Sequence, residues 1–254
     1  MSGLVCAGNV LINPYINGVL TGFVGPINAT KFSLSPGQAD KLDRVSYQRD
    51  TFGNALDSVV FPGVSSLSID TDDAAAEILQ FSMLATLSDV ALSQGQVLVG
   101  APESAIAHLD RWTRLANRNV ASVVVKDVTD VTTYVNGTDY TLDATSGLVK
   151  ALASGSINDG DTLHVSYNYG ALSGKQLIAA TQTEVRAYVL LDGKNLANQK
   201  KVEIVVPEAV LVPSGELDVA GKKFVTFSLS GSVVTRSGEL GPYTYRELTE
   251  TAYA

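Results

Sequence analysis

The sequence predicts a mainly β protein that carries one packed α-helix. Apolar and polar residues alternate with a period of two in several short segments, and turn-forming residues separate these segments. Only one stretch has helical spacing. With 254 residues, of which 45% are hydrophobic and 17% charged, the chain can bury a sizeable core and does not have a disordered protein's composition. We expect a β-sandwich with one helix, a long projecting loop and an inserted small β unit.

The N-terminal segment has no charged side chain before Lys31. A signal peptide or membrane anchor does not fit, because no basic residue leads the segment and Asn, Gly and Pro interrupt its apolar stretch. We therefore expect an extended arm that runs into a strand, and no membrane partner. Cys6 is the one cysteine of the chain, so an internal disulfide is excluded and a reducing compartment is expected.

Residues 35–57 are predicted to form a projecting loop or long hairpin between strands around Phe32 and Val59. Pro36, Gly37 and Gly53 punctuate the segment, and its length exceeds that of an ordinary connection. Long connections of this kind are usually functional or disordered. Its charged residues are Asp40, Lys41, Asp43, Arg44, Arg49, Asp50 and Asp57.

Residues 71–92 are predicted as the helix. The aspartates at 70, 72 and 73 suit a helix N-terminus, and the alanines that follow are strong helix formers. Apolar residues then recur at three- and four-residue steps, which indicates a stripe that faces the core. These residues are Leu79, Met83, Leu87 and Val90.

Residues 119–173 resemble a compact β unit inserted into a larger domain made of 1–118 and 174–254. Strands are expected at 120–125, 133–135, 140–142, 148–152 and 162–169, with glycine-containing turns at 136–137, 146–147 and 158–160. The inserted segment holds six aspartates and two lysines, and so carries half of the net charge of −8.

The clearest alternation lies between residues 224 and 235. One side of this predicted strand is apolar, and the other has only small hydroxyl groups and no charge, which is unusual for a face in water. Leu67 and Ile69 alternate in the same way with Ser66, Ser68 and Asp70. The apolar side consists of Val225, Phe227, Leu229 and Val233, and the hydroxyl side of Thr226, Ser228, Ser230 and Ser232.

No motif predicts catalysis, a cofactor or a metal site. The glycine patterns that bind phosphate are absent, and Cys6, His108 and His164 lie too far apart in sequence for a zinc site. A calcium loop that starts at Asp70 would need its last carboxylate at position 81, which is Phe81. No nucleophile elbow of the G-x-S-x-G type occurs. We expect a protein that is not an enzyme.

The net charge of −8 also counts against a protein that wraps nucleic acid, because phosphate binding needs a basic stripe. The arginines have acidic neighbours in sequence at Asp43, Asp50 and Asp110, so ion pairs between subunits are the favoured interpretation. These arginines are Arg44, Arg49, Arg111, Arg114 and Arg118.

Several short motifs occur in a fixed order along the chain. They are 28–34 (NATKFSL), 49–57 (RDTFGNALD), 111–112 with 118–120, 134–140 (YVNGTDY), 159–162 (DGDT), 205–211 (VVPEAVL) and 213–215 (PSG). In this order they resemble those of the major tail tube proteins of long-tailed bacteriophages. The resemblance spans most of the chain, although no single motif is diagnostic.

The resemblance implies a β-sandwich subunit that forms hexameric rings, which stack into a tube for viral DNA. Partners would be other copies of the chain and tail proteins such as the tape measure, the tail terminator and the distal tail protein; DNA would pass without specific binding. The protein would be assembled in the host cytoplasm and reside in the virion tail. The insertion at 119–173 would lie on the tube exterior.

The resemblance also assigns roles to residues. The hydroxyl side of 224–235 would face the lumen, a loop would bridge subunits and rings, and the C-terminal arm would contact neighbours. The loop residues are Arg44, Tyr47, Arg49, Asp50 and Phe52, and the arm residues are Tyr243 and Tyr245, with Tyr253 further along. Alternatives are a secreted Ig-like adhesin module, or a tube or terminator subunit of a contractile tail or secretion apparatus.

Overall fold

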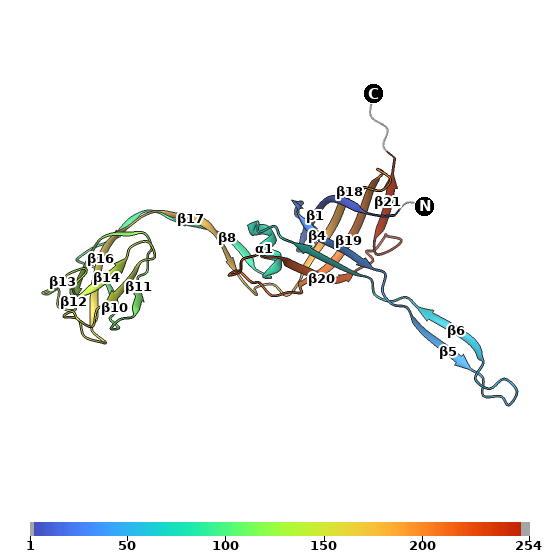
Figure 1. The fold of residues 1–254 in the computed structure, drawn as a ribbon, viewed down its shortest axis with the longest axis horizontal. Helices are drawn as coiled ribbons and strands as arrows, with labels where there is room; N and C mark the ends of the chain where they lie inside the picture. Colours follow the sequence, from blue (N-terminus) through green and yellow to red (C-terminus); the bar gives the residue numbers. More distant parts are fainter. Residues whose placement is uncertain (1–2, 250–254) are drawn as a thin grey trace, which may run out of the picture. The chain divides into compact units, whose positions relative to one another are not determined.

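The computed structural model describes residues 3–249 and confirms a mainly β fold, with one helix among the strands of that range (Figure 1). The chain forms two compact units. Unit 1 consists of Met1–Ser88 and Leu177–Ala254, and unit 2 consists of Asp89–Gln176. Each unit has its own cluster of buried hydrophobic residues.

Unit 1 is built on one antiparallel sheet of nine strands. Neighbouring strands along its main path are β2, β1, β18, β19, β20, β7 and β4, while β21 pairs with β19 and β3 with β1. The strands are β1 (Cys6–Ile16), β2 (Val19–Leu20), β3 (Val24–Ile27), β4 (Ala29–Ser35), β7 (Ser66–Thr71), β18 (Val185–Asn195), β19 (Lys201–Pro213), β20 (Phe227–Val233) and β21 (Thr244–Leu248).

One continuous segment, β3 followed by β4, links strands near the two opposite ends of the sheet. The sheet therefore curls around one core. Only Asn28 separates β3 from β4, yet β3 pairs with β1 and β4 pairs with β7. The inward side of the central strands is mostly apolar, as in Ile12, Val189, Leu211 and Ile69, which are fully buried. Burial of these side chains is the main source of stability for the unit.

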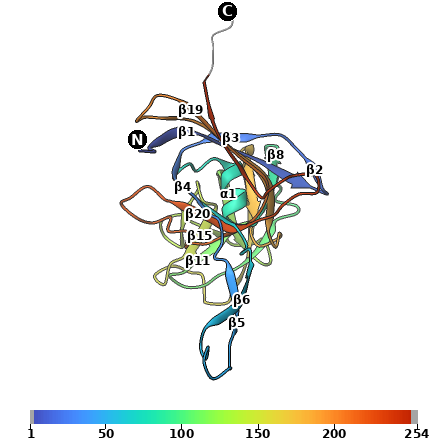
Figure 2. The same cartoon turned by 90° about the vertical axis from the view of Figure 1, so that its right-hand side faces the viewer.

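The helix α1 (Ala76–Ser82) packs against β19 and β20 and buries Ile78 and Phe81 in the same core (Figure 2). The prediction of a helix over 71–92 is wrong in length. Leu84 has a positive φ of 48°, and the backbone N–H groups of Ala180 and Thr181 donate to the carbonyls of Met83 and Leu84. These bonds divert the chain into a strand, β8 (Thr86–Leu92).

Leu87 and Val90 therefore belong to a strand and not to a helical stripe. Their three-residue spacing is compatible with either structure over so short a segment. β8 pairs with β17 (Leu172–Ile178), and both boundaries between the units fall within this two-stranded ribbon.

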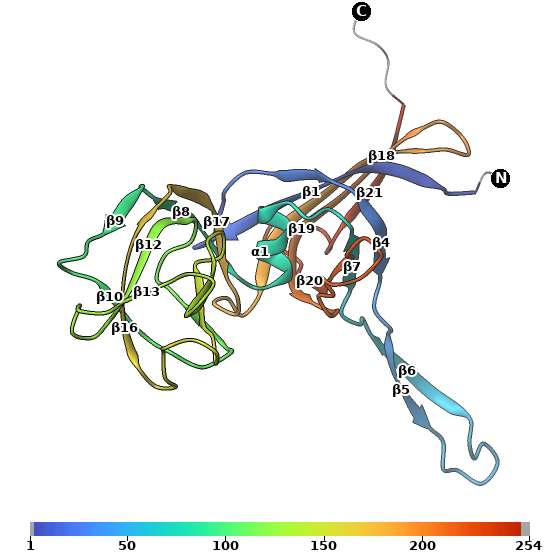
Figure 3. The same ribbon diagram turned by 60° about the vertical axis from the view of Figure 1, so that its left-hand side comes forward.

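Residues 35–57 form most of a long hairpin, which is one of the two structures predicted for this segment. Strands β5 (Asp40–Val45) and β6 (Ala55–Phe61) pair with each other alone among the described strands, and every residue in them is exposed. The hairpin extends away from the sheet of unit 1 in both Figure 1 and Figure 3.

Unit 2 consists of two small antiparallel sheets over a separate core. One sheet has the order β10-β16-β12-β13, with β9 also paired to β16, and the other has the order β11-β15-β14. The strands are β9 (Gly95–Val97), β10 (Glu103–Ile106), β11 (Trp112–Arg114), β12 (Val120–Asp127), β13 (Thr133–Tyr134), β14 (Tyr140–Asp143), β15 (Leu148–Ala151) and β16 (Thr162–Tyr169).

The predicted boundaries of the insertion at 119–173 are too narrow, because residues 89–118 and 174–176 also belong to unit 2. Its five predicted strands correspond to β12–β16, whereas β9, β10 and β11 come from the segment assigned to the larger domain. These three strands are short, with three or four residues each, and show little alternation. Ala105, Ala107 and Leu115 from this segment are buried in the core of unit 2.

Candidate assembly surfaces

The outward side of the sheet in unit 1 has rows of serines across three neighbouring strands. The strand register aligns Ser33 with Ser68 and Ser230 in one row. It aligns Ser35 with Ser66 and Ser232 in the next. Because the residues between them point into the core, all of these hydroxyl groups lie on the opposite side of the sheet. We call this surface the serine face: Ser33, Ser35, Ser66, Ser68, Ser228, Ser230 and Ser232.

Three of the four predicted hydroxyl residues belong to this face, namely Ser228, Ser230 and Ser232. Thr226 is exposed but lies one residue before the start of β20. The serines of β4 were not predicted, although the alternation of Phe32 and Leu34 with serines is the same signal over a shorter segment. None of the serines on the face is fully buried.

Four cations on this side of the sheet are each paired with a carboxylate, whereas Lys194 of β18, opposite Lys201, has no ion pair within residues 3–249. Lys31 lies in β4 opposite Asp70, and the two groups flank the serine rows. In consequence the outward side has no unbalanced positive charge at these positions. The ion pairs are Lys31–Asp70 at 4.0 Å, Arg186–Glu208 at 2.8 Å, Lys201–Asp192 at 3.6 Å and Arg246–Glu203 at 3.0 Å.

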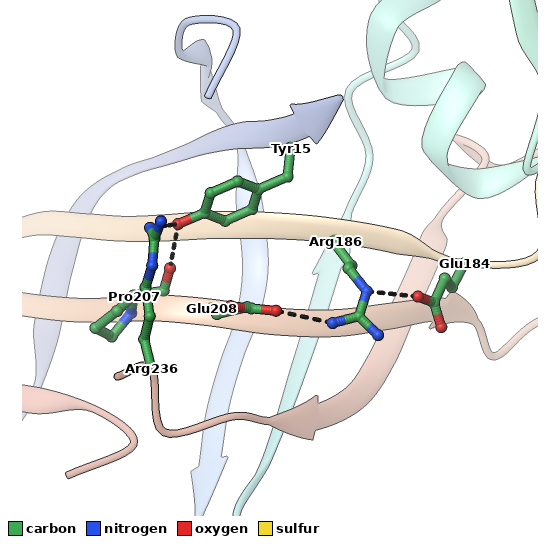
Figure 4. A network of polar contacts seen from close by, with 6 residues as sticks. All are labelled: Tyr15, Glu184, Arg186, Pro207, Glu208 and Arg236. Carbon is green, nitrogen blue, oxygen red and sulfur yellow. Dashed lines mark hydrogen bonds and ion pairs between the residues drawn. The ribbon is translucent and has the colours of Figure 1, made fainter. Parts of the chain in front are cut away.

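Figure 4 shows how Arg186 is held between two carboxylates. Its Nε donates to Glu184 at 2.6 Å and its Nη1 donates to Glu208 at 2.8 Å. Both hydrogen bonds raise the pKa of Arg186 above its ordinary value, and the one to Glu184 has the larger effect. The two carboxylates thus offset the charge of this guanidinium.

The second cation in Figure 4, Arg236, lies over the ring of Tyr15 with its guanidinium carbon 5.1 Å from the ring centroid. Its Nη1 donates to the Tyr15 hydroxyl at 2.5 Å, and that hydroxyl donates to the carbonyl of Pro207 at 3.0 Å. Residues from β1, β19 and the segment after β20 are thereby tied together.

The hairpin carries exposed apolar side chains on both of its sides, mixed with charged ones. The register pairs Leu42 with Val59 and Asp40 with Phe61, so Leu42, Val59 and Phe61 share a side with Asp40 and remain 65%, 48% and 51% exposed, while Val60 lies opposite Lys41 on the other side. On the other side Lys41 pairs with Asp43 at 3.0 Å. A hydrogen bond from Ser58 and the nearby Lys41 hold the pKa of Asp43 below its ordinary value.

The end of the hairpin, residues 46–54, is a loop fixed by its own hydrogen bonds. The backbone N–H of Ser46 donates to Asn54, and that of Gly53 donates to Ser46, at 2.8 and 2.9 Å. The buried Ser46 hydroxyl is also bonded to Thr51 at 2.7 Å. This ordered loop presents two rings that stack edge to face at 5.8 Å. We call Tyr47 and Phe52, which are 83% and 70% exposed, the aromatic tip.

The other predicted hairpin residues are charged and exposed. Arg44 lies in β5 opposite Asp57. Arg49 and Asp50 are neighbours within the loop and form an exposed ion pair at 3.2 Å. The structure thus brings the five predicted residues onto one hairpin, although Arg44 lies on its strand and the other four at its end.

The two tyrosines of the predicted C-terminal arm have different surroundings. Tyr243 is half-buried and packs against the core of its own unit. Tyr245 lies in β21, opposite Ile204 of β19, and is 46% exposed. Tyr253 lies outside the described residues.

Within residues 3–249, no group of three His, Cys, Asp or Glu side chains is arranged to hold a metal ion. In the same range, no helix is both long enough and apolar enough to cross a bilayer.

No curated protein sequence matches the chain. A family profile matches residues 4–245, which is nearly the whole chain and includes both units. The chain therefore belongs to the family described as protein of unknown function UCP028589.

Proposed function

We propose that this protein is the structural subunit of a bacteriophage tail tube, which polymerises as stacked hexameric rings and conducts viral DNA during ejection. The observation that carries the proposal is the uncharged serine face, together with the pairing of Lys31 and Arg186 with carboxylates on the same side of the sheet. The face would line the lumen of the tube. The protein would reside in the virion tail after assembly in the host cytoplasm.

A wall made of small hydroxyl groups suits a conduit for DNA. Each free lysine or arginine that meets a phosphate adds a sequence-independent attraction, which would retain the DNA instead of letting it pass. The serine rows contain no charge, and the cations beside them are paired with carboxylates. DNA would therefore slide along the wall without specific binding.

The hairpin supports polymerisation, because its exposed apolar side chains have no cover within unit 1. Exposed apolar surface of this extent typically marks an interaction site. Arg44, Arg49 and Asp50 would contribute ion pairs across the same contact, with the aromatic tip at its centre. Tyr245 would take part in a further contact between neighbours. Other partners would be the tape measure, tail terminator and distal tail proteins.

Unit 2 would project from the tube exterior, where its strands do not obstruct the lumen. Its separate core is consistent with a module added to a tube-forming domain. Its two-sheet architecture also favours a second candidate, an Ig-like binding or adhesin module. In that case the whole chain would remain a monomer at all concentrations.

Negative-stain electron microscopy of the purified chain over a range of concentrations separates these candidates. A tail tube subunit gives rings or tubes of uniform diameter, whereas an adhesin module gives separate particles. Subunits of a contractile tail or secretion apparatus would also give tubes, with a sheath-binding exterior. Monomers under every condition tested would refute the proposal.

The double variant Arg44→Glu/Arg49→Glu tests the role of the hairpin in that assembly. We expect folded subunits that no longer extend into tubes, because like charges would meet across the contact. Far-UV circular dichroism checks the fold, and Lys222→Glu in an exposed loop serves as the matched control. Tubes of normal length from the double variant would show that the hairpin charges are not at an interface.

A further inference from the structure

A groove of about 740 Å³ opens at the root of the hairpin, on unit 1. One wall comes from the residues that enter and leave the hairpin, and the other from the segment that follows β20. Its lining is mostly apolar, and two of its side chains are exposed: Val64 to 71% and Leu240 completely. We call it the proline groove, and its principal lining residues are Pro36, Pro62, Val64, Leu240, Pro242 and Tyr243.

The same chain therefore carries two exposed apolar features, the aromatic tip and the proline groove. The tip cannot fill the groove of its own chain. The groove lies at the root of the hairpin, and β6 alone spans seven residues, or about 20 Å at the usual rise per residue. An aromatic tip can therefore meet a proline groove only on another copy.

The loop that carries the aromatic tip is already ordered in the free subunit. Its loop is held by the backbone bonds of Ser46 with Asn54 and Gly53, so little conformational entropy is lost on docking. Aromatic rings are the side chains that most often dominate interfaces, and a proline-lined groove is a rigid apolar receptor for them.

Charge is complementary at the same two places. Arg49 lies within the tip loop with its side chain 93% exposed; its Nε is paired with the exposed Asp50, and its two terminal nitrogens make no ion pair within residues 3–249. Glu239 precedes Leu240 at the lip of the groove and is exposed. Within the described part of the chain Glu239 makes no ion pair, so an arginine from another copy can approach it.

We infer that the aromatic tip of one copy docks in the proline groove of the next, with Arg49 beside Glu239. The inference rests on the proposed function in that it names the contact by which the subunits polymerise. The two surfaces are different, so the contact is heterologous and each copy has one free tip and one free groove. Repetition of such a contact extends an assembly in one direction or closes it into a ring.

Cross-linking tests the contact directly, because Cys6 is the chain's one cysteine. On a Cys6→Ser background, one protein carries Gln48→Cys beside the tip and another carries Thr235→Cys in the groove. Mixed and treated with diamide, the two should form a disulfide-linked heterodimer within the assembly. A mixture of Gln48→Cys with Ser88→Cys, placed in β8, is the control and should remain unlinked.

A second experiment tests the direction of the contact. Tyr47→Ala/Phe52→Ala removes the tip, and Val64→Glu/Leu240→Glu blocks the groove; all four side chains are exposed, so the fold should be retained. Each variant alone should need at least about tenfold more protein to assemble. Mixed together they should form one junction and stop, since each supplies only one working surface. Sedimentation velocity distinguishes short stopped assemblies from long ones.

The outcomes separate this inference from the proposed function. Tubes that form without the cross-link between positions 48 and 235 would overturn the tip-and-groove contact but would still support the proposed function. A specific cross-link between copies without any tube would support the contact and count against the tail tube. Absence of both would overturn both.

Discussion

At the residue scale, one glycine decides whether two central strands can pair. Gly231 lies in β20 opposite Leu211 of β19, and a Cβ placed on it would fall 1.8 Å from the carbonyl oxygen of Val210. Backbone atoms in the middle of a sheet cannot move aside without breaking the ladder. The requirement for glycine here comes from close approach and not from an unusual backbone angle.

We therefore expect Gly231→Ala to destabilise unit 1 by about 1–3 kcal/mol, the usual range for overpacking. Gly215→Ala is the matched control, because its Cβ would lie 3.7 Å from the nearest atom, which is ordinary contact. Urea unfolding followed by circular dichroism measures both changes. Equal stability of the two variants would contradict the close approach.

A single carboxylate has a comparable role in unit 2. Asp139 accepts hydrogen bonds from the backbone N–H groups of Val135 and Ser156, at 2.8 and 2.9 Å, and so joins two loops. Both bonds lower the pKa of Asp139 below its ordinary value, and the one from Val135 has the larger effect. Trp112, the one tryptophan of the chain, lies in unit 2, so its fluorescence reports on this unit alone.

Because the folded pKa of Asp139 is lowered, its contribution is complete above the unfolded value of about 3.9. It is lost as the pH falls through the folded pKa. We expect Asp139→Asn to lower the melting temperature of unit 2 by several degrees at pH 7, and by less at pH 3. Tryptophan fluorescence measures the transition, with Asp89→Asn as the control. An equal effect at both pH values would contradict the role of the carboxylate.

At the element scale, the sequence predicted the strands with clear alternation and the hydroxyl side of β20. The sequence could not predict that these serines form rows across three strands, because the register between distant segments depends on tertiary pairing. Ser33 and Ser230 are almost 200 positions apart in the sequence, yet both align with Ser68. The helix was predicted too long for a related reason, since its end depends on hydrogen bonds from the distant residues 180–182.

The hairpin illustrates the same limit. Its charges and its punctuating proline and glycines predicted a projecting segment. Its cluster of exposed apolar side chains was not predicted, because Leu42 lies across the register from Val59, and neither segment alone shows a clean alternation. Only pairing of the two strands places these side chains together.

The serine face provides a prediction at this scale. We expect the double variant Ser68→Lys/Ser230→Lys to give assemblies that retain DNA, because two free cations per subunit would line the path of the phosphates. Retention should weaken steeply as the salt concentration rises. Ser88→Lys/Ser173→Lys, with both lysines in the ribbon segment, adds the same charge elsewhere. Assemblies of both variants are to be compared by DNA co-sedimentation at several salt concentrations, and equal retention would contradict a lumenal serine face.

At the scale of the whole molecule, the division into two units with separate cores predicts that unit 2 is dispensable for assembly. Removal of residues 89–176, with a two-residue turn between Ser88 and Leu177, keeps every residue of the unit 1 core. We expect this variant to form tubes of the same inner diameter and a smaller outer diameter. A folded variant that stays monomeric would show that unit 2 belongs to the subunit contact.

The most direct test of a tube-forming subunit is a cryo-electron microscopy map of the assembled full-length protein. We predict stacked sixfold rings in which β4, β7 and β20 line the bore with their serines, and in which unit 2 lies outside. A bore lined by other strands, or an assembly with unit 2 inside it, would contradict the proposed function.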